Sequence, residues 1–201
     1  MIVIGLTGSI GMGKSTTAKM FESEGVPFFD ADAEAHKLMA KDGAAVPLIE
    51  AAFPGVVRDG EVDRQLLGQS VFGDEAALMK LEHILHPMIG EKREQFLQAS
   101  EREKRPMVVL DIPLLFEKGH HAQFDAVVVV SAPDDVQRAR VMARDGMIAD
   151  KLDAILAFQM PDVEKRTRAD YVVDTGKGLD GALEHVRAII NDLQKQSPKK
   201  G

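Results

Sequence analysis

Two kinds of hydrophobic pattern alternate along this chain. Short uninterrupted apolar runs are typical of buried strands in a parallel sheet, and apolar residues spaced three or four apart are typical of amphipathic helices. Runs of the first kind predict strands that begin at Ile2 and cover 26–29, 107–111, 124–130 and 171–174. Because helical segments separate them, the sequence predicts a doubly wound α/β fold with a parallel sheet of about five strands.

The segment between the second and third predicted strands has the helical pattern almost throughout. We interpret 33–104 as a helical subdomain that binds an acceptor, inserted into a nucleotide-binding core of 1–32 and 105–201, all within one domain over 1–201. Proline is tolerated at the first position of a helix, so Pro87 is expected to begin the helix that runs to about residue 103. The tail at 196–201 is expected to fray.

The segment that directly follows the first predicted strand carries the clearest chemical signal. Gly8 to Ser15 fit the pattern G-x-x-x-x-G-K-[ST] of a phosphate-binding loop, and they lie between a strand and a helix as that motif requires. Glycines allow the backbone N–H groups to surround an anion, while lysine reaches the outer phosphates and the hydroxyl can bind Mg²⁺. The motif predicts binding of ATP with Mg²⁺ through Gly11, Met12, Gly13, Lys14, Ser15 and Thr16.

Acidic residues end two of the other predicted strands. Ligands gather at the carboxyl ends of parallel strands, so Asp32 and Asp111 are candidates for catalysis and metal binding. Asp30 and Asp32 are two positions apart, and on a strand they would share one face. Asp30 has an equally good alternative as the N-cap of the following helix.

Arg140 and Arg144 are spaced i, i+4, which places both on one face of a predicted helix. We interpret 138–168 as a lid that closes on phosphates. A solvated helix face explains the same spacing as well.

Composition narrows the choice of partner. The chain has a formal net charge of −7 and no cysteine, one tyrosine and no tryptophan. These values disfavour nucleic acid, an anionic membrane and a disulfide framework, so an anionic ligand would need a local positive cluster. Without a recognisable signal sequence or membrane span, we expect a cytoplasmic protein that is a monomer or a weak homo-oligomer.

Five segments together resemble the dephospho-coenzyme A kinases. They are the phosphate loop, Asp30-Ala31-Asp32, Leu85-His86-Pro87-Met88-Ile89, Asp111-Ile112-Pro113-Leu114-Leu115-Phe116-Glu117, and the stretch from Gln137 through Arg144 to Tyr171. The resemblance implies transfer of the γ-phosphate of ATP to the ribose 3′-hydroxyl of dephospho-coenzyme A. Thr175 departs from it, because the family frequently has asparagine there.

The resemblance also implies a role for each site residue. Asp32, Lys14 and Arg140 would be catalytic, with Asp32 as the base, and Arg144 would help to bind the nucleotide. Ser15 and Asp111 would hold Mg²⁺, and residues near Gln159 and Thr175 would face the adenine. The acceptor would be bound by Thr7, Asp32, His86, Leu114, Leu115 and Phe116.

Two other functions compete with this interpretation. Another small-molecule kinase, such as a nucleotide kinase, would share the loop and the arginines but would not explain the segment 111–117. A GTP-dependent switch would need an N-K-x-D element, and the only asparagine is Asn191.

Overall fold

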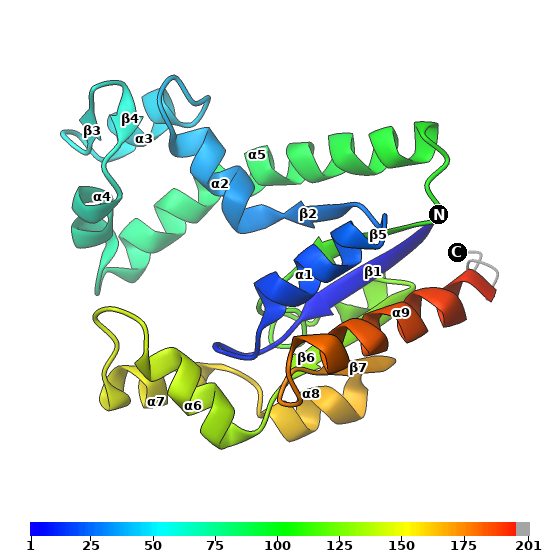
Figure 1. Cartoon of the computed structure of the whole chain (residues 1–201). Helices are drawn as coiled ribbons and strands as arrows, with labels where there is room; N and C mark the ends of the chain where they lie inside the picture. Colours follow the sequence, from blue (N-terminus) through cyan, green and yellow to red (C-terminus); the bar gives the residue numbers. More distant parts are fainter. Residues whose placement is uncertain (196–201) are drawn as a thin grey trace. The chain divides into compact units, whose positions relative to one another are not determined.

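The computed structural model describes residues 1–195, so the predicted fraying of 196–201 lies outside the described residues (Figure 1). The chain divides into two compact units, one of Met1–Phe29 with Ser100–Gly201 and one of Asp30–Ala99. We describe each unit by itself.

A five-stranded sheet forms the centre of the first unit, as the sequence predicts, in the order β2-β5-β1-β6-β7. Strand β1 runs parallel to β5 on one side and to β6 on the other, and β6 runs parallel to β7. The strands are β1 (Ile2–Thr7), β2 (Phe28–Asp30), β5 (Met107–Asp111), β6 (Ala126–Ser131) and β7 (Tyr171–Asp174).

Side chains that alternate along β6 build the core on both faces of the sheet. Val128 and Val130 belong to a buried cluster with residues of α1 and α9, which pack against each other. Val127 and Val129 pack with Leu115 on the opposite face. This alternation explains why β6 is apolar throughout. The helices of this unit are α1 (Lys14–Ser23), α6 (Asp134–Met142), α7 (Ala149–Phe158), α8 (Asp162–Arg168) and α9 (Leu179–Lys195), with a 3₁₀ turn at His120–Gln123.

The second unit is mainly helical and has its own core, centred on buried residues such as Ile49 and Leu67. It contains α2 (Ala31–Met39), α3 (Val46–Ala52), α4 (Arg64–Val71) and most of α5 (Glu75–Arg102). The hairpin of β3 (Val57–Arg58) and β4 (Glu61–Val62) was not predicted. Its strands are two residues long, too short for a periodic pattern.

The predicted helix start at Pro87 is wrong, because Pro87 lies inside α5. An internal proline costs a helix about 3 kcal/mol. The apolar residues Leu81, Ile84 and Leu85 before it and Met88 and Ile89 after it pack against the same core. This continuous stripe favours one helix over two.

Within residues 1–195 we find no helix with both the length and the apolar character that crossing a membrane requires.

Candidate active site

The loop between β1 and α1 has a backbone that requires glycine at two positions. Gly11 and Gly13 have φ values of 78° and 95°, in the left-handed region. A Cβ on Gly11 would also lie 2.4 Å from Cγ2 of Val141. The loop can therefore hold this conformation only with these glycines.

The loop ends at the N-terminus of α1, where backbone donors are available. Gly13 is the N-cap, and the N–H of Thr17 makes the first helical bond, to the carbonyl of Gly13, at 3.0 Å. The N–H groups of Lys14, Ser15 and Thr16 have no partner within the helix. Together with the positive end of the helix, they form an anion-binding site.

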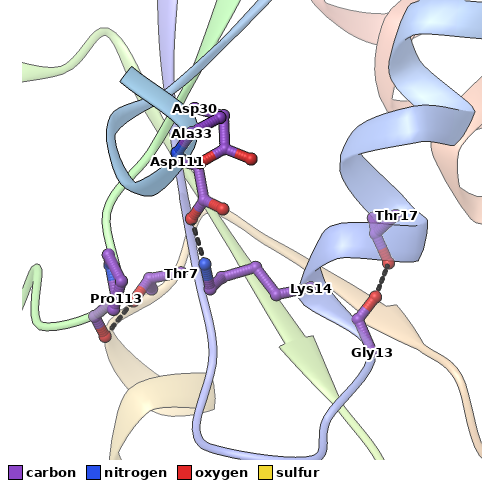
Figure 2. A network of polar contacts seen from close by, with 8 residues as sticks. All are labelled: Thr7, Gly13, Lys14, Thr17, Asp30, Ala33, Asp111 and Pro113. Atoms are coloured by element: carbon purple, nitrogen blue, oxygen red, sulfur yellow. Dashed lines mark hydrogen bonds and ion pairs between the residues drawn. The ribbon is translucent and has the colours of Figure 1, made fainter. Parts of the chain in front are cut away.

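The Lys14 ammonium forms an ion pair with the carboxylate of Asp111 at the carboxyl end of β5 (Figure 2). Both side chains are largely buried, with exposures of 15% and 8%. The pairing of Leu6 with Asp111 places the end of β5 beside the end of β1. The structure thus brings together two residues that the sequence assigned to the phosphate and metal sites. Hydroxyl and carboxylate oxygens are ligands that Mg²⁺ accepts, so Ser15 and Asp111 suit it chemically.

Arg140, from α6, is held beside the same loop. Its Nη1 donates to the Thr175 hydroxyl and its Nη2 to the Thr175 carbonyl, both at 2.8 Å. A Cβ on Gly13 would lie 3.6 Å from Nη1. Helix α6 ends at Met142 with Ala143 as its C-cap, so Arg144 lies beyond the helix and the prediction that it shares a helix face with Arg140 is wrong; Arg144 is exposed.

Two glutamines that the sequence did not single out for this role hold the back of the loop. The buried Gln137 donates to the carbonyl of Ile10 at 2.7 Å, and the Gln159 Oε1 accepts from the N–H of Ile10 at 3.1 Å. They lie on α6 and directly after α7. The N–H and the carbonyl of one residue, Ile10, are thereby satisfied from the predicted lid segment and from Gln137 just before it, and no local sequence signal reveals these contacts.

Several predicted ligand contacts fall on buried groups. The side chain of Met12 is in the core, and its N–H donates to Ser9 at 3.2 Å. The Thr7 hydroxyl donates to the carbonyl of Pro113 at 3.1 Å (Figure 2). Leu115 and Phe116 are buried in a core cluster, and Leu114 is half-buried. Contact of these residues with a ligand stays a prediction.

Glu117 closes the segment 111–117 with an ion pair that supports the loop. Its Oε1 lies 2.9 Å from Nζ of the fully buried Lys165 and accepts from the N–H of Met160 at 2.8 Å. Burial by itself raises the pKa of Glu117, but the bonds from Lys165 and Met160 together hold that pKa below its ordinary value. The pair fixes the backbone next to Gln159.

Asp32 and His86 belong to the second unit. Helix α2 begins at Ala31, so the expectation that Asp30 and Asp32 share a strand face is wrong. Asp30 is instead the N-cap of α2 and accepts from the N–H of Ala33 at 2.9 Å, as its alternative reading predicted. Asp32 is exposed in the first turn of α2. His86 is exposed on α5, where its Nε2 lies 4.0 Å from Oε1 of Glu82.

Comparisons with known proteins identify the family. The model of the dephospho-CoA kinase family matches residues 2–180. A dephospho-CoA kinase of Mesorhizobium japonicum is 56% identical over 98% of both chains. One from Rhodopseudomonas palustris is 54% identical over the full length of both.

Solved structures agree with the sequence comparisons. A crystal structure of a Thermus thermophilus protein has a TM-score of 0.79 and 37% identity, covering 96% of this chain and 97% of that one. The dephospho-CoA kinase of Campylobacter jejuni has a TM-score of 0.66 and 26% identity, covering 96% and 98%. The chain therefore belongs to the dephospho-CoA kinase family.

Proposed function

We propose that this protein transfers the γ-phosphate of ATP to the ribose 3′-hydroxyl of dephospho-coenzyme A, the last step of coenzyme A synthesis. The family supports the acceptor. The observation that carries the chemistry is the position of Lys14, which extends from the phosphate loop to Asp111 at the end of the neighbouring strand.

The donor side would act by placing positive charge around the phosphates. Phosphoryl transfer needs little covalent help from the protein and depends on orientation and neutralisation of charge. When ATP binds, Lys14 exchanges Asp111 for the outer phosphates, and Arg140 neutralises the charge that develops on the transferred group. Gly11, Met12, Gly13, Thr16 and Arg144 would contribute further contacts to the nucleotide.

Ser15 and Asp111 would hold Mg²⁺, which when bound supplies positive charge to the phosphate oxygens. On the acceptor side, Asp32 would orient the 3′-hydroxyl and accept its proton. His86, Thr7 and the segment Leu114, Leu115 and Phe116 would contact the acceptor. Residues 33–104 would form its subdomain and 138–168 a lid. We further propose that the protein is cytoplasmic and a monomer or weak homo-oligomer.

A comparison of acceptors tests this function. We expect ATP-dependent addition of one phosphoryl group to dephospho-coenzyme A, detected by mass spectrometry, and none to its 3′-deoxy analogue. Nucleoside monophosphates are the matched competitors, because they carry a nucleoside without the pantetheine arm. Faster phosphorylation of a nucleoside monophosphate than of dephospho-coenzyme A would contradict the proposal and favour a nucleotide kinase.

A further inference from the structure

We propose that Thr175 is a positioning residue that holds Arg140 and the phosphate loop in one arrangement. The inference rests on the proposed function, which gives Arg140 its role in the reaction. It concerns a side chain that would act without touching the transferred phosphate.

The position of Thr175 is fixed by the central sheet. This residue directly follows β7, where Asp174 pairs with Ser131 of β6. Its N–H continues the ladder by donating to the carbonyl of Ser131 at 2.8 Å, and the residue is 7% exposed. The backbone therefore fixes the position from which the hydroxyl extends, and the hydroxyl has little access to water.

The Thr175 hydroxyl joins the loop to the arginine. It donates to the carbonyl of Met12 at 2.8 Å, with the carbonyl of Ser131 further away at 3.3 Å. The same oxygen accepts from Nη1 of Arg140, while the Thr175 carbonyl accepts from Nη2. Two bonds to one residue fix the plane of the guanidinium, because its donors form a rigid fork. They use two of its five N–H groups and leave three for an anion.

The bond to Met12 also orients a donor of the loop. The carbonyl of Met12 and the N–H of Gly13 belong to one planar trans peptide and point in opposite directions. Holding that carbonyl towards Thr175 therefore directs the N–H of Gly13 away from it. One hydroxyl thus sets the geometry of a backbone donor and of Arg140.

Substitutions at Thr175 separate the hydroxyl from the shape of the side chain. Thr175→Val removes the hydroxyl and keeps the volume, and Thr175→Ser keeps the hydroxyl. Loss of a hydrogen bond to a charged group predicts a fall in kcat of roughly ten- to a hundredfold for Thr175→Val. We expect KM for dephospho-coenzyme A to change by less than about threefold, and Thr175→Ser to recover most of kcat. Ser23→Ala is the control, since that exposed hydroxyl bonds to the carbonyl of Met20 within its own helix, α1.

A double-mutant cycle with Arg140→Ala tests whether Thr175 acts through Arg140. We expect Thr175→Val to have a much smaller effect in the Arg140→Ala background than in the native protein. Independent, multiplicative effects would overturn the inference, and so would a normal kcat for Thr175→Val when Arg140→Ala is slow. An unchanged rate for Arg140→Ala would instead contradict the role proposed for that arginine.

A measurement on the native protein covers the case in which Thr175→Val does not fold. Arginine side-chain NMR should show slow rotation of the Arg140 guanidinium and fast rotation of the exposed Arg144. Equal mobility of the two would overturn the inference, whatever the outcome of the acceptor assay.

Discussion

At the scale of single residues, the proposed function gives the ion pair of Lys14 the role of preparing the free protein for a polyphosphate. Its ammonium is held in the site by Asp111, and its side chain is only 15% exposed. The carboxylate keeps the cation desolvated and in place until a more highly charged anion arrives. The other groups proposed for the donor side include backbone N–H groups, which substitution cannot remove directly.

Lys14→Met keeps most of the side-chain length and removes the charge. We expect kcat for dephospho-coenzyme A to fall roughly 10²- to 10³-fold, the usual effect of losing one donor to a developing charge. Steady-state kinetics with both substrates measure this. Lys19→Met, an exposed lysine on the same helix, should keep full activity. An active Lys14→Met enzyme would remove the charge argument.

Asp32→Asn tests the proposed base. A general base contributes about 10²- to 10⁴-fold, so we expect kcat to fall within that range while ATP binds normally. Single-turnover kinetics and ATP titration separate the two effects. Glu34→Gln is the control, because it removes another carboxylate from the first turn of α2. Weak ATP binding in Asp32→Asn would show that this carboxylate serves the nucleotide.

At the scale of elements, the loop depends on segments that are distant in sequence. Gln137 and Gln159 hold the carbonyl and the N–H of Ile10, and the pair of Glu117 with Lys165 fixes the chain beside Gln159. The strength of that pair should depend on pH. Because the pKa of Glu117 is lowered in the folded protein, its contribution is complete above the ordinary value of 4.5 and is lost as pH falls through the lowered value.

Glu117→Gln leaves the buried Lys165 without its anion. We expect it to lower the free energy of unfolding by about 3 kcal/mol near neutral pH. The difference in the free energy of unfolding between Glu117→Gln and the native protein should become smaller at pH values below the ordinary carboxyl pKa. Urea unfolding over a pH series would show this. Glu164→Gln breaks the exposed ion pair with Arg168 on α8, the helix that carries Lys165. It should lower the free energy of unfolding by less than about 0.5 kcal/mol. A difference independent of pH would contradict the ionic explanation.

Pro87 is a second feature of an element, a proline retained inside a helix. Pro87→Ala restores a helical hydrogen bond, so we expect the free energy of unfolding to rise by about 1 to 3 kcal/mol. Thermal and urea unfolding measure the change. Pro47→Ala is the control, because Pro47 lies in the first turn of α3, where no helical bond is missing. Destabilisation by Pro87→Ala would mean that the packing of α5 depends on the proline.

At the scale of the whole molecule, two units with separate cores carry the predicted sites. The overall charge of −7 gives no general attraction to anionic substrates, so local groups must provide it. Each substrate should then stabilise mainly the unit that binds it.

Hydrogen exchange with one ligand at a time tests this division. We expect ATP to protect amides of the phosphate loop and α1, and dephospho-coenzyme A to protect amides of 30–99 together with those of 114–116. At about one hundred times Kd, amides that exchange by opening of the bound unit should slow about a hundredfold. Buffer with inorganic phosphate alone is the control. Protection of only the first unit by dephospho-coenzyme A would contradict an acceptor site in the helical unit.

The sequence alone determined the features that depend on neighbouring residues. Gly8 to Ser15 predicted the phosphate loop because strand, glycines, lysine and hydroxyl are consecutive, and the apolar runs predicted the five strands. The predictions from sequence missed the hairpin at 57–62, although Asp59-Gly60 is a typical hairpin turn. They also misplaced a helix start at Pro87, because packing of the helix overrode the preference of proline for the first helical position.

Only the tertiary structure decided what holds the site together. Thr175 is 163 residues from Met12 in sequence, and Gln159 is 149 residues from Ile10. No periodicity or motif encodes such a pair, since the contacts depend on strand order and on where each helix ends. The sequence therefore specified which groups could bind phosphate, and the fold decided which of them are fixed beside one another.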